Sequence, residues 1–164
     1  GIDVPEVVAD DFSPIKAAQA IVDNMPIAQA VHGGDRAFYH PAKDSVRLPK
    51  QAQFLTPEAY YATAFHELVH STGHNSRLNR PEVMDLTSFG DDPYAREELV
   101  SEMGAAMLFG LSGIDATFDN SAAYVASWLK RIKDDKKLII GAAGKAQAAA
   151  DYILDTKFDN KDES

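Results

Sequence analysis

The segment His66-Glu67-Leu68-Val69-His70 places two histidines four residues apart, with a glutamate directly after the first. Residues i and i+4 of an α-helix lie on one face, one turn apart, so both imidazoles can reach a single ion. Zinc accepts nitrogen ligands at about 2.0–2.1 Å in tetrahedral geometry. Glu67 points in a neighbouring direction, from which a carboxylate can reach a water at the metal and act as a base. We therefore predict a metal centre held by His66 and His70, with Glu67 as the catalytic base.

A catalytic zinc needs a third protein ligand, and a downstream segment offers Glu97, Glu98 and Glu102. Glu98 and Glu102 lie one helical turn apart on a single face. Glu102 is followed by an apolar run, so we expect it to be partly buried and to have a partner. A metal-binding histidine needs an acceptor for its other N–H, so we predict Glu98 as the ligand and Glu102 as that acceptor. Glu97 is interpreted as part of a solvated acidic face, and stays open as an alternative ligand.

His74 is a rival for the third ligand position, one turn beyond His70. Gly73 is expected to end the helix before it, which favours Glu98. A structural role near the helix end, or the polarisation of a substrate carbonyl, are the other interpretations of His74. Hydrolysis also needs a group that stabilises an oxyanion, and His74, Arg77 and Tyr94 are the candidates.

Helices are needed to position these side chains. Thr56-Pro57 is typical of a helix start, with an N-cap followed by Pro at the first position, and Gly73 is the expected end. Asp92-Pro93 predicts the start of a second helix that runs to about Leu111. The apolar stripe of the first helix comprises Tyr61, Ala64, Phe65, Leu68, Val69 and Thr72.

The segment before these helices predicts one more helix and a small sheet. Ser13-Pro14 predicts a helix start with Ser13 as the N-cap, and Pro26 the end of that helix. Three short strand-like pieces follow, and turn-rich breaks between them predict an antiparallel meander. We expect the third of them to be an edge strand beside the motif helix, where an extended peptide could add. The pieces are Ile27–Val31, Arg36–His40 and Ser45–Leu48.

Two further helices are predicted towards the C-terminus. Asp119 or Asn120 caps the first, whose stripe of Tyr124, Trp128 and Leu129 is interpreted as core packing, and an Ala-rich helix over 135–154 is expected to be a scaffold. The fold class is therefore α+β, mostly helical with a small antiparallel sheet. Residues 1–12 are expected to be a linker or junction, 13–156 the domain, and 157–164 a flexible tail.

Composition limits the class of protein. With 164 residues, 45% of them hydrophobic, the chain fits one compact domain. It contains no apolar run of about 18 residues, so we expect no membrane span, and its acidic N-terminus does not resemble a signal peptide. The absence of cysteine excludes disulfides and thiolate metal sites and is compatible with the cytoplasmic location that we expect.

The net charge of -9 makes the domain a poor candidate for a surface that follows nucleic-acid phosphates. Basic residues do cluster locally, and we interpret them as solvated helix faces rather than as a binding patch. They are Arg77, Arg80, Lys130, Arg131, Lys133, Lys136 and Lys137.

The stretches TAFHELVHSTGHNSRLNR and FGDDPYAREELVSEMGAAML together resemble the zincin-like metallopeptidase domain of ArdC-type antirestriction proteins. Related domains occur in conjugative-plasmid primases and phage polyvalent proteins. GGDRAFYHPAKDSVRLP and NSAAYVASWLK also match that family's pattern, and the resemblance covers about residues 13–155. It implies a zincin-like fold and a gluzincin arrangement in which His66, His70 and a glutamate bind the metal.

The spacing of EELVSEMGAA is similar to the ligand helix of thermolysin-type enzymes, where the residue matching Glu102 is an aspartate. The resemblance implies a role for Glu98 as ligand and Glu102 as the acceptor for a ligand histidine. Antirestriction relatives usually carry an N-terminal domain that binds single-stranded DNA, for which this chain has no room. We therefore expect single-stranded DNA binding to belong to that missing part.

Two functions are compatible with these residues. The first is a zinc metallopeptidase of mobile genetic elements that cuts a protein or peptide substrate, and a His/His/Glu site would also accept manganese or another divalent metal. The second is a non-catalytic, metal-stabilised module that protects incoming DNA by binding restriction enzymes or by assisting single-stranded DNA binding. Glu67 favours the enzyme, because a structural zinc site is closed by four protein ligands and needs no base. The oligomeric state and the substrate stay open.

Overall fold

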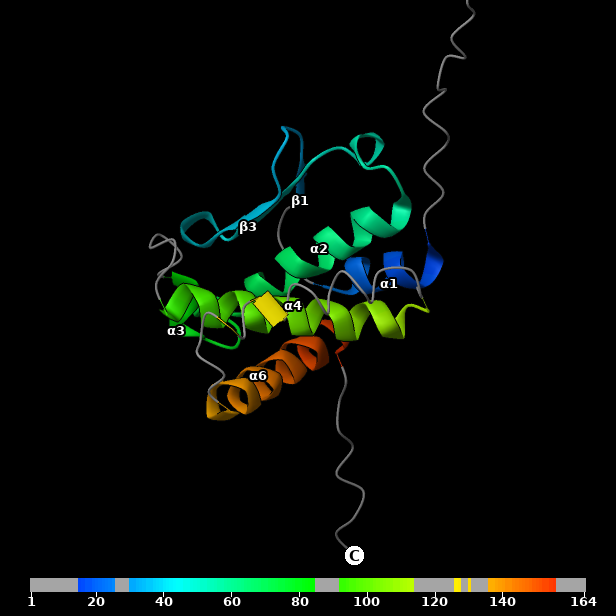
Figure 1. Cartoon of the computed structure of the whole chain (residues 1–164). Helices are drawn as coiled ribbons and strands as arrows, with labels where there is room; N and C mark the ends of the chain where they lie inside the picture. The colour runs from blue at the N-terminus through cyan, green and yellow to red at the C-terminus, as the bar shows by residue number, and fades with distance from the viewer. Residues whose placement is uncertain are drawn as a thin grey trace, which may run out of the picture.

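The helix that carries the motif, α2 (Pro57–Thr72), lies at the centre of the fold, between a small sheet and α4 (Asp92–Leu111) (Figure 1). In this computed structural model, α6 (Lys136–Leu154) packs beneath α4, and α1 (Lys16–Asn24) lies beside α2. The structure describes residues 15–25, 30–84, 92–113, 126–127, 130 and 136–155. No helix within those ranges is long and apolar enough to cross a membrane.

Helix α2 has the predicted bounds. The Thr56 hydroxyl accepts a hydrogen bond from the Ala59 N–H at 3.2 Å, Pro57 occupies the first turn, and Gly73 is the C-cap. The predicted apolar stripe is buried in the core that α2 shares with its neighbours. Both ends of the helix and its inward face therefore follow from local sequence.

Gly73 ends α2 for a reason other than its backbone freedom. Its φ of -78° is open to any residue. A Cβ added there would lie 2.3 Å from Val83 Cγ2 and 2.9 Å from Arg80 Nη2. The missing side chain thus lets the segment that leads through α3 (Pro81–Met84) return tightly against the end of α2.

The two long helices after α3 also match their predicted bounds. Helix α4 runs from Asp92 to Leu111, and α6 ends at Leu154. Several alanine side chains of α6 are fully buried, which allows this helix to pack closely and is consistent with the expected scaffold. They include Ala146, Ala149 and Ala150.

The sheet is mixed, so the predicted antiparallel meander is wrong. Its strands β1 (Ala30–His32), β2 (Phe38–His40) and β3 (Ser45–Leu48) lie in the order β1-β3-β2, and β3 pairs parallel with β1 and antiparallel with β2. The predicted edge strand, β3, is therefore central, and β1 and β2 are the edges.

The turn after β1 accounts for this order. Gly33 and Gly34 have φ of 147° and 77°, and the Gly33 N–H donates to the Leu48 carbonyl at 2.8 Å. The chain thus crosses the end of β3 before it starts β2. The β2–β3 hairpin then closes through the short 3-10 helix η1 (Pro41–Lys43), and a second, η2 (Gln51–Gln53), follows β3.

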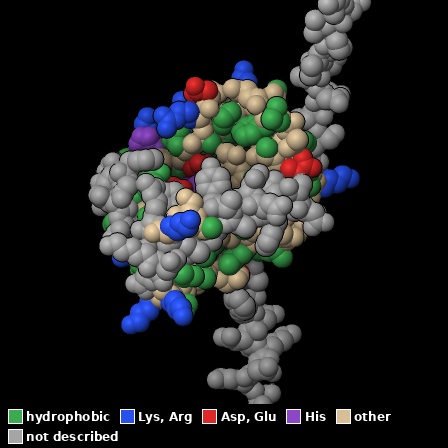
Figure 2. All heavy atoms as spheres, viewed as in Figure 1, with side chains coloured by type: hydrophobic (Ala, Val, Ile, Leu, Met, Phe, Trp, Pro, Cys, Tyr) green, Lys and Arg blue, Asp and Glu red, His purple; other side chains and the backbone are tan. Residues whose placement is uncertain are grey.

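One face of the sheet packs on α2 and the other is open. Tyr39, Val46 and Leu48 are buried, whereas the register brings Val31, Arg47 and Phe38 into one row on the exposed face. Figure 2 shows Lys and Arg side chains above the sheet in this view; the exposed basic residues of the segment are Arg36, Lys43, Arg47 and Lys50. Four exposed basic side chains thus lie in the sheet segment of a chain whose net charge is negative, together with the exposed Asp35.

The start of α1 differs from the prediction. Ile15, whose backbone is still extended, is the N-cap in place of Ser13, so the helix begins at Lys16. The predicted linker, the tail, the beginning of the first strand and the stripe of Tyr124, Trp128 and Leu129 fall outside the described residues.

Candidate metal centre

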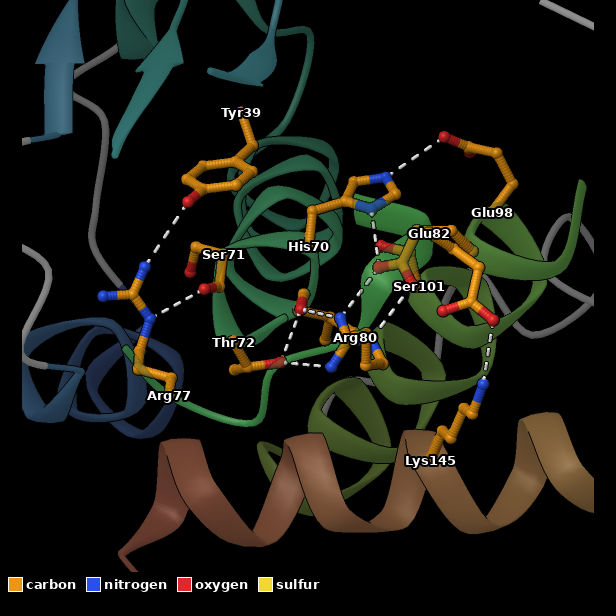
Figure 3. Close-up of polar contacts among 12 residues, drawn as sticks. Tyr39, His70, Ser71, Thr72, Arg77, Arg80, Glu82, Glu98, Ser101 and Lys145 are labelled. Atoms are coloured by element: carbon orange, nitrogen blue, oxygen red, sulfur yellow. Dashed lines mark hydrogen bonds and ion pairs between the residues drawn. The ribbon is translucent and has the colours of Figure 1, made fainter. Parts of the chain in front are cut away.

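Three predicted ligands converge between α2 and α4. His66 Nε2 lies 3.2 Å from Glu98 Oε2, His70 Nε2 lies 3.1 Å from Glu98 Oε1, and the two Nε2 atoms are 3.1 Å apart. All ligand atoms of this group lie within 4.8 Å of one another. Figure 3 shows Glu98 reaching His70 from α4.

The other nitrogen of each imidazole faces a carboxylate from α4. His66 Nδ1 lies 3.0 Å from Glu102 Oε1, and His70 Nδ1 lies 3.1 Å from Glu97 Oε1. A carboxylate only accepts, so both Nδ1–H groups donate, and each imidazole in its neutral form presents an Nε2 lone pair to the same point. Glu98 adds carboxylate oxygens there, and such a set of acceptors in close contact requires a cation among them.

The donor set fits a divalent metal. Four tetrahedral ligands at 2.0–2.1 Å from zinc would be separated from one another by roughly 3.3 Å. The separations of 3.1–3.2 Å among His66, His70 and Glu98 are close to this value. Two imidazoles and one carboxylate suit zinc, and they also suit manganese, cobalt or nickel.

The electrostatics of these groups favour positive charge at the same point. Burial alone would lower the pKa of His70, but its hydrogen bonds with Glu97 and Glu98 outweigh this and raise the pKa to about 9. In the same way, Glu102 and Glu98 overcome burial and raise the pKa of His66. Burial would raise the pKa of Glu98, but its hydrogen bonds with the two histidines hold it well below the usual range. Without a metal, protons would take its place.

Glu67 lies beside the ligands. Its side chain is buried, and burial raises the pKa of its carboxyl against the lowering effect of His70 and His66. The Tyr39 backbone contributes a small lowering of the pKa of Glu67, so Glu67 lies close to strand β2. A buried carboxylate of raised pKa beside a metal site is suited to proton transfer.

The structure corrects the interpretation of Glu97 as a solvated acid. Glu97 is only 1% exposed and lies between His70 and the guanidinium of Arg80. Arg80 donates from Nε to Glu97 Oε2 at 3.0 Å and from Nη2 to Glu97 Oε1 at 2.8 Å. The number of acceptors could have identified Glu97, because two ligand histidines need two N–H acceptors and Glu102 can serve only one of them.

Arg77 and Arg80 form neither a basic patch nor a solvated helix face. Arg77 donates to the Ser71 carbonyl at 2.7 Å and pairs with both carboxylate oxygens of Asp44, which also accepts from the Tyr39 hydroxyl at 2.8 Å. Figure 3 shows Arg77 on the Tyr39 side of α2, away from Glu98. Arg77 thus fastens the β2–β3 hairpin to α2, and we no longer count it as an oxyanion candidate.

His74 and Tyr94 lie near the ligand residues in the sequence, but neither belongs to the cluster of His66, His70 and Glu98. His74 Nδ1 accepts from the Ser76 N–H at 3.2 Å and contacts the Ser76 hydroxyl at 2.7 Å, so the neutral ring carries its proton on Nε2. The group of ligand atoms found among the described residues does not include His74. Tyr94 is half-buried on α4, one turn before Glu98.

Comparison with known proteins identifies a family for this chain. A family model described as a zincin-like metallopeptidase matches residues 16–145. The DNA primase TraC of Escherichia coli is 45% identical over 122 residues, which cover 74% of this chain and 8% of the primase. The chain therefore corresponds to a small part of that relative.

Two crystal structures of the antirestriction protein ArdC from the R388 plasmid are similar to this fold. The Mn(II)-bound form has a TM-score of 0.65 and 42% identity, and covers 86% of this chain and 51% of ArdC. The metal-free form gives a TM-score of 0.63 and 40% identity, with 86% and 49% coverage. The chain thus spans about half of ArdC, and a similar fold exists with a divalent metal and without one.

Proposed function

The chain belongs to the zincin-like metallopeptidase family, and on that premise we propose that it hydrolyses peptide bonds with a bound zinc ion. The observation that carries the proposal is the convergence of His66 Nε2, His70 Nε2 and the Glu98 carboxylate beside the buried Glu67. Three protein ligands leave one tetrahedral position for water or substrate, as in catalytic zinc sites.

A bound divalent metal would polarise the scissile carbonyl and lower the pKa of water at the site. Glu67 would accept the proton of the attacking water on its carboxylate and return it to the leaving amine. The raised pKa of Glu67 supports the first half of that transfer, because a carboxylate of higher pKa is a stronger base.

The substrate would lie along β2. β2 is an edge strand whose residue Tyr39 pairs with Val46 of β3, so its other side is unpaired among the described strands. The effect of the Tyr39 backbone on the pKa of Glu67 favours β2 as the strand beside the site. An extended peptide could add there as a further strand, with its main chain held by hydrogen bonds. Strand β3 has neighbours on both sides, so β2 takes its place as the edge strand proposed for the substrate.

His74 and Tyr94 are the proposed donors to the oxyanion. The Nε2–H that the Ser76 contacts favour on His74 is a donor in the neutral ring, and Tyr94 lies on the α4 face that also carries Glu98. Replacing either should lower kcat more than it raises KM, because an oxyanion donor acts in the transition state.

Zinc is the proposed metal because its preferred ligands and tetrahedral geometry match two imidazoles and a carboxylate. The Mn(II)-bound ArdC structure makes manganese the main rival. Metal analysis of protein purified without added metal, followed by reconstitution with each ion, distinguishes them.

Glu67→Gln tests the hydrolase proposal. The amide keeps the shape of the side chain but cannot take the proton. The variant should therefore bind metal like the parent, and its rate of hydrolysis should be about 10²–10⁴-fold lower. A library of unstructured peptides, analysed by mass spectrometry after incubation with each protein, gives the readout. Equal cleavage by parent and variant would contradict the role of Glu67.

The antirestriction role of ArdC favours a second candidate, a metal-stabilised docking module that acts without hydrolysis. Its partner would be a restriction enzyme, and any single-stranded DNA contact would come from a separate N-terminal domain. The negative charge of the chain is compatible with this function. If Glu67→Gln keeps full protection of incoming DNA in cells whereas Glu98→Ala loses it, the docking module is the better account.

A further inference from the structure

Arg80 is a buried arginine whose guanidinium donates four hydrogen bonds near the metal centre. It is 5% exposed. Besides the two hydrogen bonds to Glu97, it donates from Nη2 to the Val69 carbonyl at 2.7 Å and from Nη1 to the Thr72 hydroxyl at 2.8 Å. Figure 3 shows it below His70, at the end of α2.

These contacts connect Arg80 to His70 by two routes. The first runs through Glu97, whose Oε1 both accepts from Arg80 Nη2 and faces His70 Nδ1. The second runs through the backbone, since Val69 and Thr72 belong to the turn of α2 that carries His70. A planar guanidinium that pairs with both oxygens of a carboxylate fixes that carboxylate in one orientation.

The acceptor of the other ligand histidine, His66, is more exposed to solvent. The side chain of Glu102, which faces His66 Nδ1, is 17% exposed, whereas that of Glu97 is 1% exposed. The rigid acceptor of the site is therefore the one that Arg80 holds.

We propose that Arg80 is a positioning residue of the metal centre, which holds Glu97 so that His70 keeps its proton on Nδ1 and presents Nε2 to the metal. This inference rests on the metal centre of the proposed function, but it does not depend on hydrolysis. Its readout is the affinity of the metal-free protein for an added metal, measured with Co²⁺, whose visible absorption also reports the ligand geometry.

Arg77 provides a matched control. It is half-buried, with a side chain only 8% exposed, pairs with a carboxylate through two nitrogens and donates to a carbonyl at the end of α2. Its carboxylate partner is Asp44, which does not contact His66, His70 or Glu98 in the described contacts. Replacing Arg77 thus removes a comparable set of hydrogen bonds, none of which involves a metal-binding residue.

The experiment compares Arg80→Met and Arg77→Met with the parent, after circular dichroism shows that each is folded at the temperature used. We expect Arg80→Met to bind Co²⁺ about 10–100-fold more weakly, the range for residues that support metal ligands, with an altered absorption spectrum. Arg77→Met should stay within about 2-fold of the parent, because its loss leaves the ligands supported. Equal losses in both variants, or no loss in Arg80→Met, would overturn the role of Arg80.

A double-mutant cycle separates positioning from general destabilisation. If Arg80 acts through Glu97, adding Arg80→Met to Glu97→Gln should weaken Co²⁺ binding no further than Glu97→Gln alone. Additive losses would overturn that route. Should Arg80→Met fail to fold, Arg80→Lys replaces it: a lysine keeps the charge but cannot pair with both oxygens, so an unchanged affinity would also overturn the proposal.

The outcomes for the two proposals are distinct. A parent that binds Co²⁺ but cleaves no peptide contradicts the hydrolase and leaves the Arg80 test intact. A parent that does not bind Co²⁺ contradicts the metal centre and, with it, the positioning role of Arg80.

Discussion

Glu97 and Glu98 are consecutive on α4, yet their carboxylates meet the two nitrogens of one imidazole. Glu97 Oε1 lies 3.1 Å from His70 Nδ1, and Glu98 Oε1 lies 3.1 Å from His70 Nε2. Neighbouring residues on a helix point about 100° apart, so the ring of His70 fits between them. One helix thus supplies a ligand and the acceptor for another ligand.

Glu102→Gln should weaken metal binding without unfolding the protein. The amide can present its NH₂ group to His66 Nδ1 and so disfavour the tautomer that leaves Nε2 free, and we expect about 10–100-fold lower Zn²⁺ affinity. Competition with a coloured chelator measures it. Glu82→Gln, which changes a remote glutamate paired with Lys145, serves as the control and should leave the affinity unchanged. The same affinity in both variants would argue against the contact of Glu102 with His66.

Metal binding should release protons at neutral pH. The pKa of His70 is raised to about 9 in the metal-free protein, so its proton is present below that pH and must leave when the metal arrives. Apparent affinity should therefore increase as the pH rises from 6 towards 9. Calorimetric titration in two buffers of different ionisation enthalpy counts the released protons. Affinity independent of pH over this interval would contradict the raised pKa.

Asp44→Asn should destabilise the protein at neutral pH but not in acid. The hydrogen bond from Arg77 lowers the pKa of Asp44 below its ordinary value of 3.8. A lowered folded-state pKa stabilises the fold above the unfolded value, and this contribution is lost as the pH falls through the folded value. Thermal unfolding of parent and variant across pH should show a Tm difference that narrows below pH 3.8. A constant difference would mean that the charge of Asp44 contributes little.

Gly73→Ala should destabilise the fold by about 1–3 kcal/mol, because the new methyl group would collide with Val83 and Arg80. For a chain of this size, Tm should fall by roughly 2–4 °C per kcal/mol. Gly110→Ala is the control. No atom lies within 4 Å of its added Cβ, so the better helix propensity of alanine should leave Tm equal or higher. A Gly73 variant as stable as the Gly110 variant would contradict the close approach.

The parts predicted well from sequence are those fixed by local signals. The ends of α2 follow from Thr56, Pro57 and Gly73, and the spacing of His66 and His70 places both on one helix face. Glu98 and Glu102 could be assigned as partners of the two histidines because both pairs have the same i, i+4 spacing, one pair on α4 and the other on α2.

The parts that were missed depend on contacts between distant segments. No local signal shows that β1 pairs parallel with β3, since only the path of the chain across Gly33 and Gly34 decides it. Glu97 looked like a surface acid because its partner, Arg80, lies 17 residues earlier and reaches it only once Gly73 lets that segment approach α2. A charged residue without a local partner is therefore the least predictable kind of site residue.

The most direct test of the metal centre is the metal content of the parent and of Glu98→Ala, measured in parallel by inductively coupled plasma mass spectrometry after exposure to excess Zn²⁺ and gel filtration. The account predicts near one zinc per parent chain and a large loss in the variant, because only two imidazoles would remain to hold the ion. A variant as fully loaded as the parent would contradict Glu98 as a ligand, and a parent without metal would contradict the centre itself.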